Sequence, residues 1–303
     1  MLKSFCRSLL ISGIGALFAL SLAAQTAAQP TDTCKHTVTG VVENFELTSK
    51  IFENTRTIRV LLPPGYSDEA NKDKRYPVLY MLDGQNLFDV CLSFNKKQEW
   101  RVDETVLELT NTGAIPPMIV VGIDNAGAQR SREYLPWKDN LFQPKMAEPE
   151  GRRHPEFLET EVMPAIDSKY RTAKGAENTA IGGSSYGGVA ALYAAVTRPD
   201  LFSKAIVESP VLWMWNGELL RLTSPLPVGP RKVFIGVGDK EFGRAEEDAL
   251  MVKLVRMLET NLKGALIRPV EVKTVIGVDG LHNEGEWARR FPEAIKFLYG
   301  SKP

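Results

Sequence analysis

Continuous apolar runs recur along the chain and are separated by amphipathic stretches. The runs cover residues 76–82, 118–123, 180–181, 204–207, 233–237 and 270–276. Strands buried on both faces have this pattern, because the helices on either side of a parallel sheet leave no face in contact with water. The runs therefore predict the parallel strands of one buried sheet.

Between these runs, apolar residues recur at three- and four-residue spacing, which is the period of an amphipathic helix. The predicted helices are 102–110, 156–167, 189–196, 246–262 and 286–298. Because strand and helix alternate, the chain is predicted to be an α/β protein with a mostly parallel, doubly wound sheet and helices on both faces. Ligands of such sheets bind at the carboxyl ends of the strands.

Two segments before the parallel strands have a different pattern. Residues 38–47 and 55–62 are rich in β-branched residues and are followed by a proline- and glycine-containing turn at 63–66. They predict an antiparallel opening pair of strands. The charged and proline-rich segment 125–156 is expected to be a long surface excursion that shapes the ligand cleft.

The first 28 residues are expected to be a secretory signal peptide. Lys3 and Arg7 precede an apolar run over residues 9–24, and small residues follow it, which is the layout of such a peptide. A retained membrane anchor is the alternative, although the run contains glycine and is short for a span of roughly 20 residues. Residues 29–303 are then expected to form a single domain.

Charge and cysteine content fit an exported protein. The chain has 37 Lys and Arg and 37 Asp and Glu, and it has no sustained basic run, so we expect no nucleic-acid partner and no membrane association after signal removal. Cys6 lies in the predicted signal peptide, which leaves one intramolecular pairing in an oxidising compartment. We predict a Cys34–Cys91 disulfide in a periplasmic or secreted protein; two free buried thiols are the alternative.

The strongest chemical signal is the segment Gly183-Ser184-Ser185-Tyr186-Gly187, which has G-x-S-x-G spacing. A serine hydroxyl needs an exposed, tight turn where a base can reach Oγ and a backbone N–H can meet the oxyanion. A predicted strand precedes the segment and a predicted helix follows it, which is the required order. Ser185 is therefore the predicted nucleophile, and a plain Gly/Ser-rich loop is the alternative.

The base is expected to be His282, which lies on a loop after a late strand and follows the serine in chain order. His36 and His154 lie in polar surroundings and are expected to be solvated surface residues. The three histidines lack ligand spacing with the cysteines, so no metal site is predicted.

The acid of the triad is expected after the strand at 233–237, where Glu241 is favoured over Asp239. A serine–histidine dyad without an acid is the alternative.

Backbone N–H groups are expected to form the oxyanion hole. One donor is predicted at Tyr186, directly after the nucleophile, and the other in the turn after the strand at 76–82. Gln85 is our choice there and Gly84 the next. The alternative is that this turn only ends the strand.

Several further segments complete a resemblance to a known family. They are 76–84, 121–125 with Arg130 and Tyr134, 170–172, 208–210, and 280–284 with Trp287. With the Ser185 turn they resemble the esterase D-like branch of the α/β-hydrolases, which contains feruloyl and acetyl-xylan esterases, S-formylglutathione hydrolases and enterobactin-type siderophore esterases. The resemblance implies the α/β-hydrolase fold. Many members carry aspartate at the Glu241 position, so Asp239 stays open.

The resemblance implies a serine hydrolase of carboxylic esters that needs no cofactor and works through an acyl-enzyme intermediate. It also implies that Arg130, Tyr134, Trp213 and Trp215 bind substrate, although each could instead be a packing residue. The expected substrate is a small-molecule or glycan-linked ester, either carbohydrate-linked or from a siderophore. An acyltransferase using the same serine and a catalytically silent binding protein are the alternatives.

Overall fold

The computed structural model describes residues 34–95, 97–138 and 148–300. One compact unit extends from Lys35 to the C-terminal end of the chain. The predicted signal peptide, residues 1–28, lies outside the described residues. Within the described ranges, no helix is both long and apolar enough to cross a bilayer.

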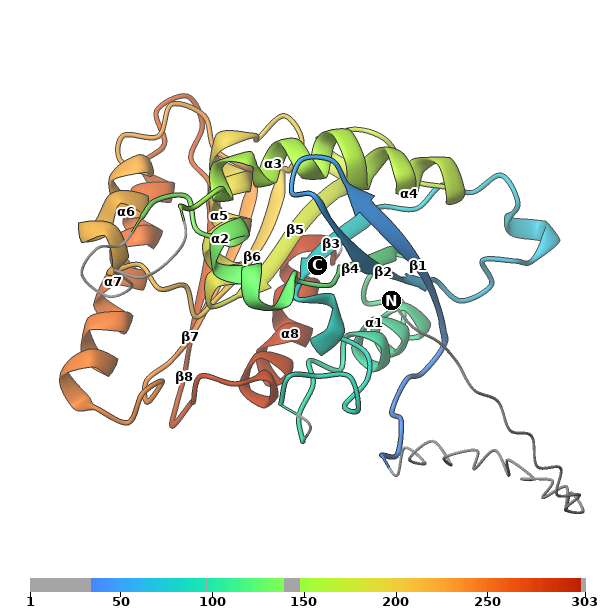
Figure 1. The fold of residues 1–303 in the computed structure, drawn as a ribbon, viewed down its shortest axis with the longest axis horizontal. Helices are drawn as coiled ribbons and strands as arrows, with labels where there is room; N and C mark the ends of the chain where they lie inside the picture. Colours follow the sequence, from blue (N-terminus) through green and yellow to red (C-terminus); the bar gives the residue numbers. More distant parts are fainter. Residues whose placement is uncertain (1–33, 96, 139–147, 301–303) are drawn as a thin grey trace, which may run out of the picture. The chain divides into compact units, whose positions relative to one another are not determined.

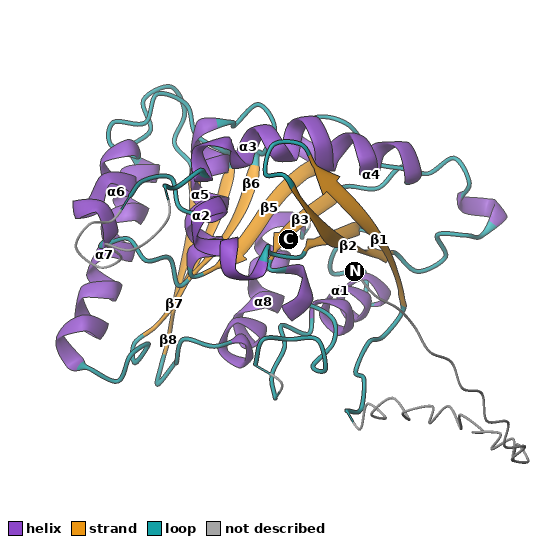
Figure 2. Cartoon of the chain, viewed as in Figure 1, coloured by secondary structure: helices purple, strands orange, loops and turns teal. Residues whose placement is uncertain are grey.

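A single mixed sheet forms the centre of this unit (Figures 1 and 2). Among the described residues its strands are β1 (Val41–Ser49), β2 (Asn54–Leu62), β3 (Val78–Leu82), β4 (Ile119–Ile123), β5 (Thr179–Ser184), β6 (Lys204–Glu208), β7 (Lys232–Gly238) and β8 (Glu271–Gly277). Their order is β1-β2-β4-β3-β5-β6-β7-β8. The β1–β2 and β2–β4 pairs are antiparallel and the other pairs are parallel, so both strand predictions are confirmed.

Helices cover both faces of the sheet, as predicted. They are α1 (Val102–Asn111), α2 (Arg130–Tyr134), α3 (His154–Phe157), α4 (Met163–Lys169), α5 (Tyr186–Thr197), α6 (Glu218–Leu222), α7 (Ala245–Lys263) and α8 (Glu284–Tyr299). The predicted helix at 156–167 is α3 and α4 joined by a π-helical turn at Leu158–Val162. Sequence periodicity missed α2 and α6, because five residues are too short to show a helical period.

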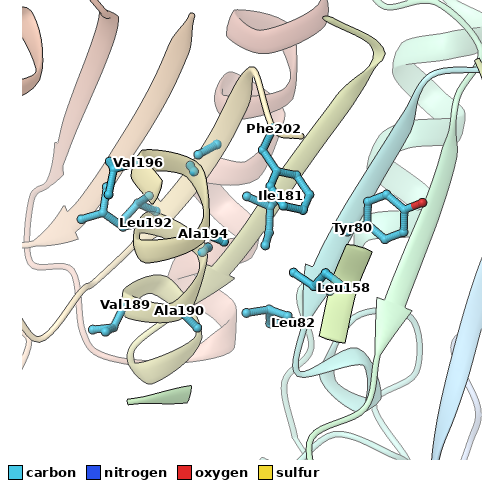
Figure 3. Packing of buried hydrophobic residues seen from close by; sticks show 14 of the residues in the cluster. Tyr80, Leu82, Leu158, Ile181, Val189, Ala190, Leu192, Ala194, Val196 and Phe202 are labelled. Carbon is cyan, nitrogen blue, oxygen red and sulfur yellow. The ribbon is translucent and has the colours of Figure 1, made fainter. Parts of the chain in front are cut away.

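Alternation along the central strands divides the core into two layers. Val78, Tyr80 and Leu82 of β3 pack with α3, α4, α5 and α7, while Leu79 and Met81 pack with α1 and α8. Figure 3 shows the first layer, in which side chains of α5 lie beside Ile181 of β5. Successive side chains of a strand point to opposite faces, so a strand that is apolar throughout can serve both layers.

His154 lies in the first of these layers, so its prediction as a surface residue is wrong. The side chain is fully buried, and the rings of Tyr134 and Phe157 lie 5.4 Å and 5.6 Å from it. Although polar residues precede it, α3 starts at His154 and turns this side chain inward. His36, in contrast, is exposed as expected and pairs with Asp89 at 2.6 Å.

Candidate active site

Ser185 occupies the sharp turn between β5 and α5. Its backbone has φ +57° and ψ −122°, a conformation that is costly for a residue with a Cβ. Its N–H donates to the carbonyl oxygen of Glu208 at 2.9 Å. This strained strand–turn–helix geometry is the one that exposes a nucleophilic serine at the end of a sheet.

The two glycines of the motif are needed for different reasons. A Cβ on Gly183 would lie 2.7 Å from the backbone carbonyl carbon of Gly187. A Cβ on Gly187 would instead meet the Asp83 carboxylate at 2.8 Å. The second glycine therefore lets the loop after β3 approach the turn.

The structure places Glu241 against His282. Oε2 of Glu241 is hydrogen-bonded to Nδ1 of His282, and the Glu241 side chain is fully buried there. The other oxygen, Oε1, accepts from Ser209 Oγ at 2.7 Å and from the Gly238 N–H at 2.6 Å. The carboxylate is thus fixed from both sides.

Asp239, the other candidate acid, lies elsewhere. Its N–H donates to the Gly277 carbonyl at 3.0 Å, and its side chain lines a separate cavity with Lys240 and Asp248. The geometry therefore brings Glu241 and not Asp239 to His282.

Aromatic rings fix the plane of the His282 imidazole. The ring of Phe242 stacks on it at a centroid distance of 5.6 Å and an interplanar angle of 23°, and the ring of Trp287 lies nearly perpendicular to it at 5.3 Å and 83°. Trp213 packs edge-on against Phe242 at 5.5 Å. Trp213 thus packs against the ring that stacks on His282.

Ser185 and His282 open into one cavity of about 510 Å³. Among the described residues it is lined by Asp83, Gln85, Asn86, Phe94, Asn95, Asn125, Arg130, Ser184, Ser185, His282, Asn283, Glu284 and Trp287. The lining is rich in amide side chains. Phe94 is 88% exposed and offers an aromatic face at the cavity.

Gln85 lies in a 3₁₀ turn, Gly84–Asn86, directly after β3. The hydrogen bonds inside this turn use the N–H groups of Asn86 and Leu87. The first N–H groups of a helical turn have no acceptor within that turn. An N–H group that donates to an oxyanion must be unpaired in this way, and the position of Gln85 is compatible with that role. Tyr186 likewise is the first residue of α5.

Arg130 reaches the cavity, but its guanidinium is bonded to Asp83. Its Nε and Nη2 donate to the two Asp83 oxygens at 2.6 Å and 2.8 Å, and Asn125 Nδ2 donates to Oδ1 at 2.7 Å. The hydroxyl of Tyr134 accepts the Asp83 N–H at 3.2 Å. Arg130 and Tyr134 therefore anchor the loop after β3.

Three of the four residues expected to bind substrate are absent from the described lining of the cavity. Tyr134 is fully buried, and Trp215 is 8% exposed and packs against Trp137 at 5.7 Å. Trp213 lies behind Phe242. The packing alternative fits these three side chains, and only Arg130 lines the cavity.

Glu208, whose backbone carbonyl accepts the Ser185 N–H, and Glu284, which lines the cavity, also have buried carboxyl groups. Burial raises the pKa of Glu208 to about 7, although Arg290 opposes this by donating to it at 2.9 Å and 2.8 Å. Burial also raises the pKa of Glu284, which lines the cavity and accepts from Asn86 at 3.5 Å. A buried ion pair therefore lies behind the Ser185 turn, and a second buried carboxyl group lies in the wall of the cavity.

Both Cys34 and Cys91 are disulfide-bonded, which confirms the predicted bridge. Among the described residues, one group has metal-ligand spacing, namely His36, Asp89 and Cys91, with atoms within 4.8 Å of one another. A disulfide sulfur is a poor ligand compared with a thiolate, so this group is not suited to a metal.

The strand order, the strained Ser185 turn and a histidine–carboxylate pair at the carboxyl edge of the sheet define an α/β-hydrolase fold. A family model named "Esterase" and described as "Putative esterase" matches residues 49–298, and the chain belongs to this esterase family. It is accordingly a carboxylic-ester hydrolase.

The chain is also similar to individual proteins in sequence or in fold. The chain is 31% identical over 152 residues to the ferri-bacillibactin esterase BesA of Bacillus subtilis, covering 46% of this chain and about half, 49%, of BesA. The fold is similar to that of the BES protein from Bacillus cereus, with a TM-score of 0.68, 20% identity and coverage of 87% and 97%. It is also similar to a ferulic acid esterase, with a TM-score of 0.63, 21% identity and coverage of 86% and 98%.

The sequence analysis assigned no role to three side chains at the site. Ser209 contacts Glu241, Phe242 stacks on His282, and Asp83 binds Arg130. Ser209 and Asp83 each follow a strand and have positive φ values of +46° and +58°. No residue-level pattern in the sequence marks these backbone conformations, since neither residue is glycine.

Proposed function

We propose that this esterase uses Ser185 as nucleophile, His282 as general base and Glu241 as the acid that orients it. The observation that carries the proposal is the shared cavity: a strained serine turn and a histidine bonded to a buried carboxylate open into the same space. The backbone N–H groups of Tyr186 and Gln85 would bind the oxyanion, where the loss of one donor costs about 3 kcal/mol.

The reaction proceeds in two half-reactions through an acyl-enzyme. His282 takes the Ser185 proton while Oγ attacks the ester carbonyl, and the imidazolium then protonates the departing alcohol. Glu241 keeps the proton on Nδ1 and stabilises the imidazolium. In the second half-reaction His282 takes a proton from water as the water attacks the acyl-enzyme carbonyl, and the imidazolium then returns the proton to Ser185 Oγ as the acid product leaves. The proposed reaction needs no cofactor.

The substrate we propose is a carbohydrate-linked ester. The amide groups of Gln85, Asn86 and Asn125 each bond to a protein group. Because an amide has two N–H donors and an oxygen with two lone pairs, each keeps capacity to donate to or accept from a sugar hydroxyl. Phe94, also in the lining, offers a face for a ring. Within the described lining the one guanidinium is already bonded to Asp83, which favours an uncharged substrate over an anionic ferric siderophore. The name of BesA refers to a siderophore ester, and the name of the similar ferulic acid esterase refers to ferulic acid. Siderophore esters and feruloyl esters are therefore both compared with the proposed substrate.

Export to the periplasm or outside the cell is also proposed. It is supported by the disulfide-bonded state of both cysteines in the described chain, because disulfides persist in oxidising compartments. Mass spectrometry of the mature N-terminus after expression with the native leader tests it; an uncleaved chain retained in the cytosol would contradict it.

The mechanism is tested with acetylated and feruloylated sugars, a siderophore ester and short aryl esters. We expect fluorophosphonate to label Ser185, and Ser185→Ala to lower kcat by roughly 10⁴-fold or more. Activity that survives in Ser185→Ala moves the nucleophile elsewhere. Product analysis with competing alcohols separates hydrolysis from acyl transfer, and a chain that reacts with neither probe nor ester is a silent binding protein.

A further inference from the structure

A line of hydrogen-bond donors ends on Glu241. The indole N–H of Trp287 donates to Ser209 Oγ at 2.9 Å, and the Ser209 hydroxyl donates to Glu241 Oε1 at 2.7 Å. The same oxygen accepts the Gly238 N–H at 2.6 Å. Two donors thus occupy Oε1, and Oε2 faces Nδ1 of His282.

The chemistry of these groups fixes the direction of each hydrogen bond. An indole nitrogen can only donate, and an ionised carboxylate can only accept. The hydroxyl between them must accept from Trp287 and donate to Glu241. The carboxylate then accepts the Nδ1 proton of His282 with its other oxygen, which leaves the Nε2 lone pair for the Ser185 proton.

The backbone holds Ser209 at this point. The residue follows β6 and is fully buried, and its N–H donates to the Gly236 carbonyl at 2.8 Å. Its φ of +46° is unfavourable for a residue with a Cβ, whereas glycine adopts it freely. Because glycine would adopt this backbone conformation at lower cost, the presence of serine indicates that its hydroxyl group has a role here.

We propose that Ser209 is a positioning residue: its hydroxyl, oriented by Trp287, holds Glu241 with Oε2 toward His282. The proposal rests on the mechanism above, in which His282 is the base. Trp287 contacts both ends of this arrangement, because it donates to Ser209 and its ring also packs perpendicular to the imidazole of His282 at a centroid distance of 5.3 Å.

Two variants test the hydroxyl separately from the backbone. Ser209→Ala and Ser209→Gly both remove the hydroxyl, while glycine also relieves the left-handed strain. With an aryl acetate as substrate, we expect both to lower kcat about tenfold, the lower end for losing a hydrogen bond to a charged group. KM should stay within about twofold, because the lost contact lies away from the substrate.

A spectroscopic measurement tests the same contact without turnover. The Nδ1 proton of a histidine bonded to a carboxylate gives a far-downfield proton resonance, assigned here by its loss in His282→Gln. We expect this resonance to shift or broaden in both Ser209 variants. Ser203→Ala is the matched control, since Ser203 is 3% exposed and takes no part in the site; it should keep the resonance and kcat of the wild type.

The proposal is overturned if Ser209→Ala and Ser209→Gly keep the wild-type kcat and an unchanged resonance. A loss confined to Ser209→Ala would also overturn it, because that pattern follows the backbone rather than the hydroxyl. A folded wild-type protein without esterase activity would refute the proposed function instead. In that case the resonance would still decide whether Ser209 holds Glu241.

Discussion

His154 should make the folded protein sensitive to acid. The imidazole is fully buried, and neither ring nitrogen has a hydrogen-bond partner among the described residues. Burial and, to a lesser extent, the nearby Arg56 lower its pKa from 6.5 to about 3. The native state therefore holds this histidine neutral where the unfolded chain binds a proton, and His154→Leu removes that difference.

The size of the effect follows from proton linkage. Because the pKa is lowered in the folded state, the stability is fully present above pH 6.5 and is lost as the pH falls toward 3. Between pH 7 and pH 5 the unfolded chain takes up most of one proton and the native state almost none. The free energy of unfolding should fall by about 2 kcal/mol over this interval, and by about 5 kcal/mol once the pH is below 3.

Urea unfolding at pH 7, 6 and 5 measures this difference. We expect the wild type to lose about 2 kcal/mol more than His154→Leu between pH 7 and pH 5. Phe157→Leu is the control, because it alters the same aromatic cluster and leaves the histidine in place; it should keep the wild-type dependence. Equal pH dependence in the wild type and His154→Leu would show that the buried imidazole is protonated as easily as in the unfolded chain.

Other predictions concern the site and the bridge. Glu241→Gln should lower kcat by roughly 10³- to 10⁴-fold because the imidazole loses its orienting anion, whereas Asp239→Asn should stay near wild type in the same ester assay; the reverse ranking would exchange their roles. Gly183→Ala should abolish fluorophosphonate labelling, because its Cβ would lie 2.7 Å from the Gly187 backbone; normal labelling would show that the turn can adjust. Replacing Cys34 and Cys91 by serine should lower the unfolding free energy by about 4 kcal/mol in denaturant titrations, as expected for a closed loop of this length; an unchanged midpoint would argue against that contribution.

Local pattern was enough to predict most elements of this fold. Apolar runs gave the positions of β3, β4 and β6 to within about two residues, and helical periodicity did the same for α1 and α7. These elements repeat a simple period over many residues, and burial of one face is what produces the period. Short elements such as α2 carry too few residues for a period to appear.

The sequence could not predict which side chains contact one another at the site. Chain order pointed to Ser185 and His282, since both follow strands whose carboxyl ends meet at one edge of the sheet. Which of Asp239 and Glu241 contacts His282 depends on a turn only two residues long, and the structure turns Glu241 inward. A difference of this kind is set by backbone direction and not by residue type.

The sequence by itself determined the sheet, its covering helices and the serine turn, because these follow from periodicity and from residues adjacent in the chain. The tertiary structure decided the burial of His154, the pairing of Arg130 with Asp83 and the contact of Ser209 with Glu241. Each of these depends on side chains from distant segments that meet at hydrogen-bonding or van der Waals distance, and such distances are fixed only when the whole sheet and its loops are packed.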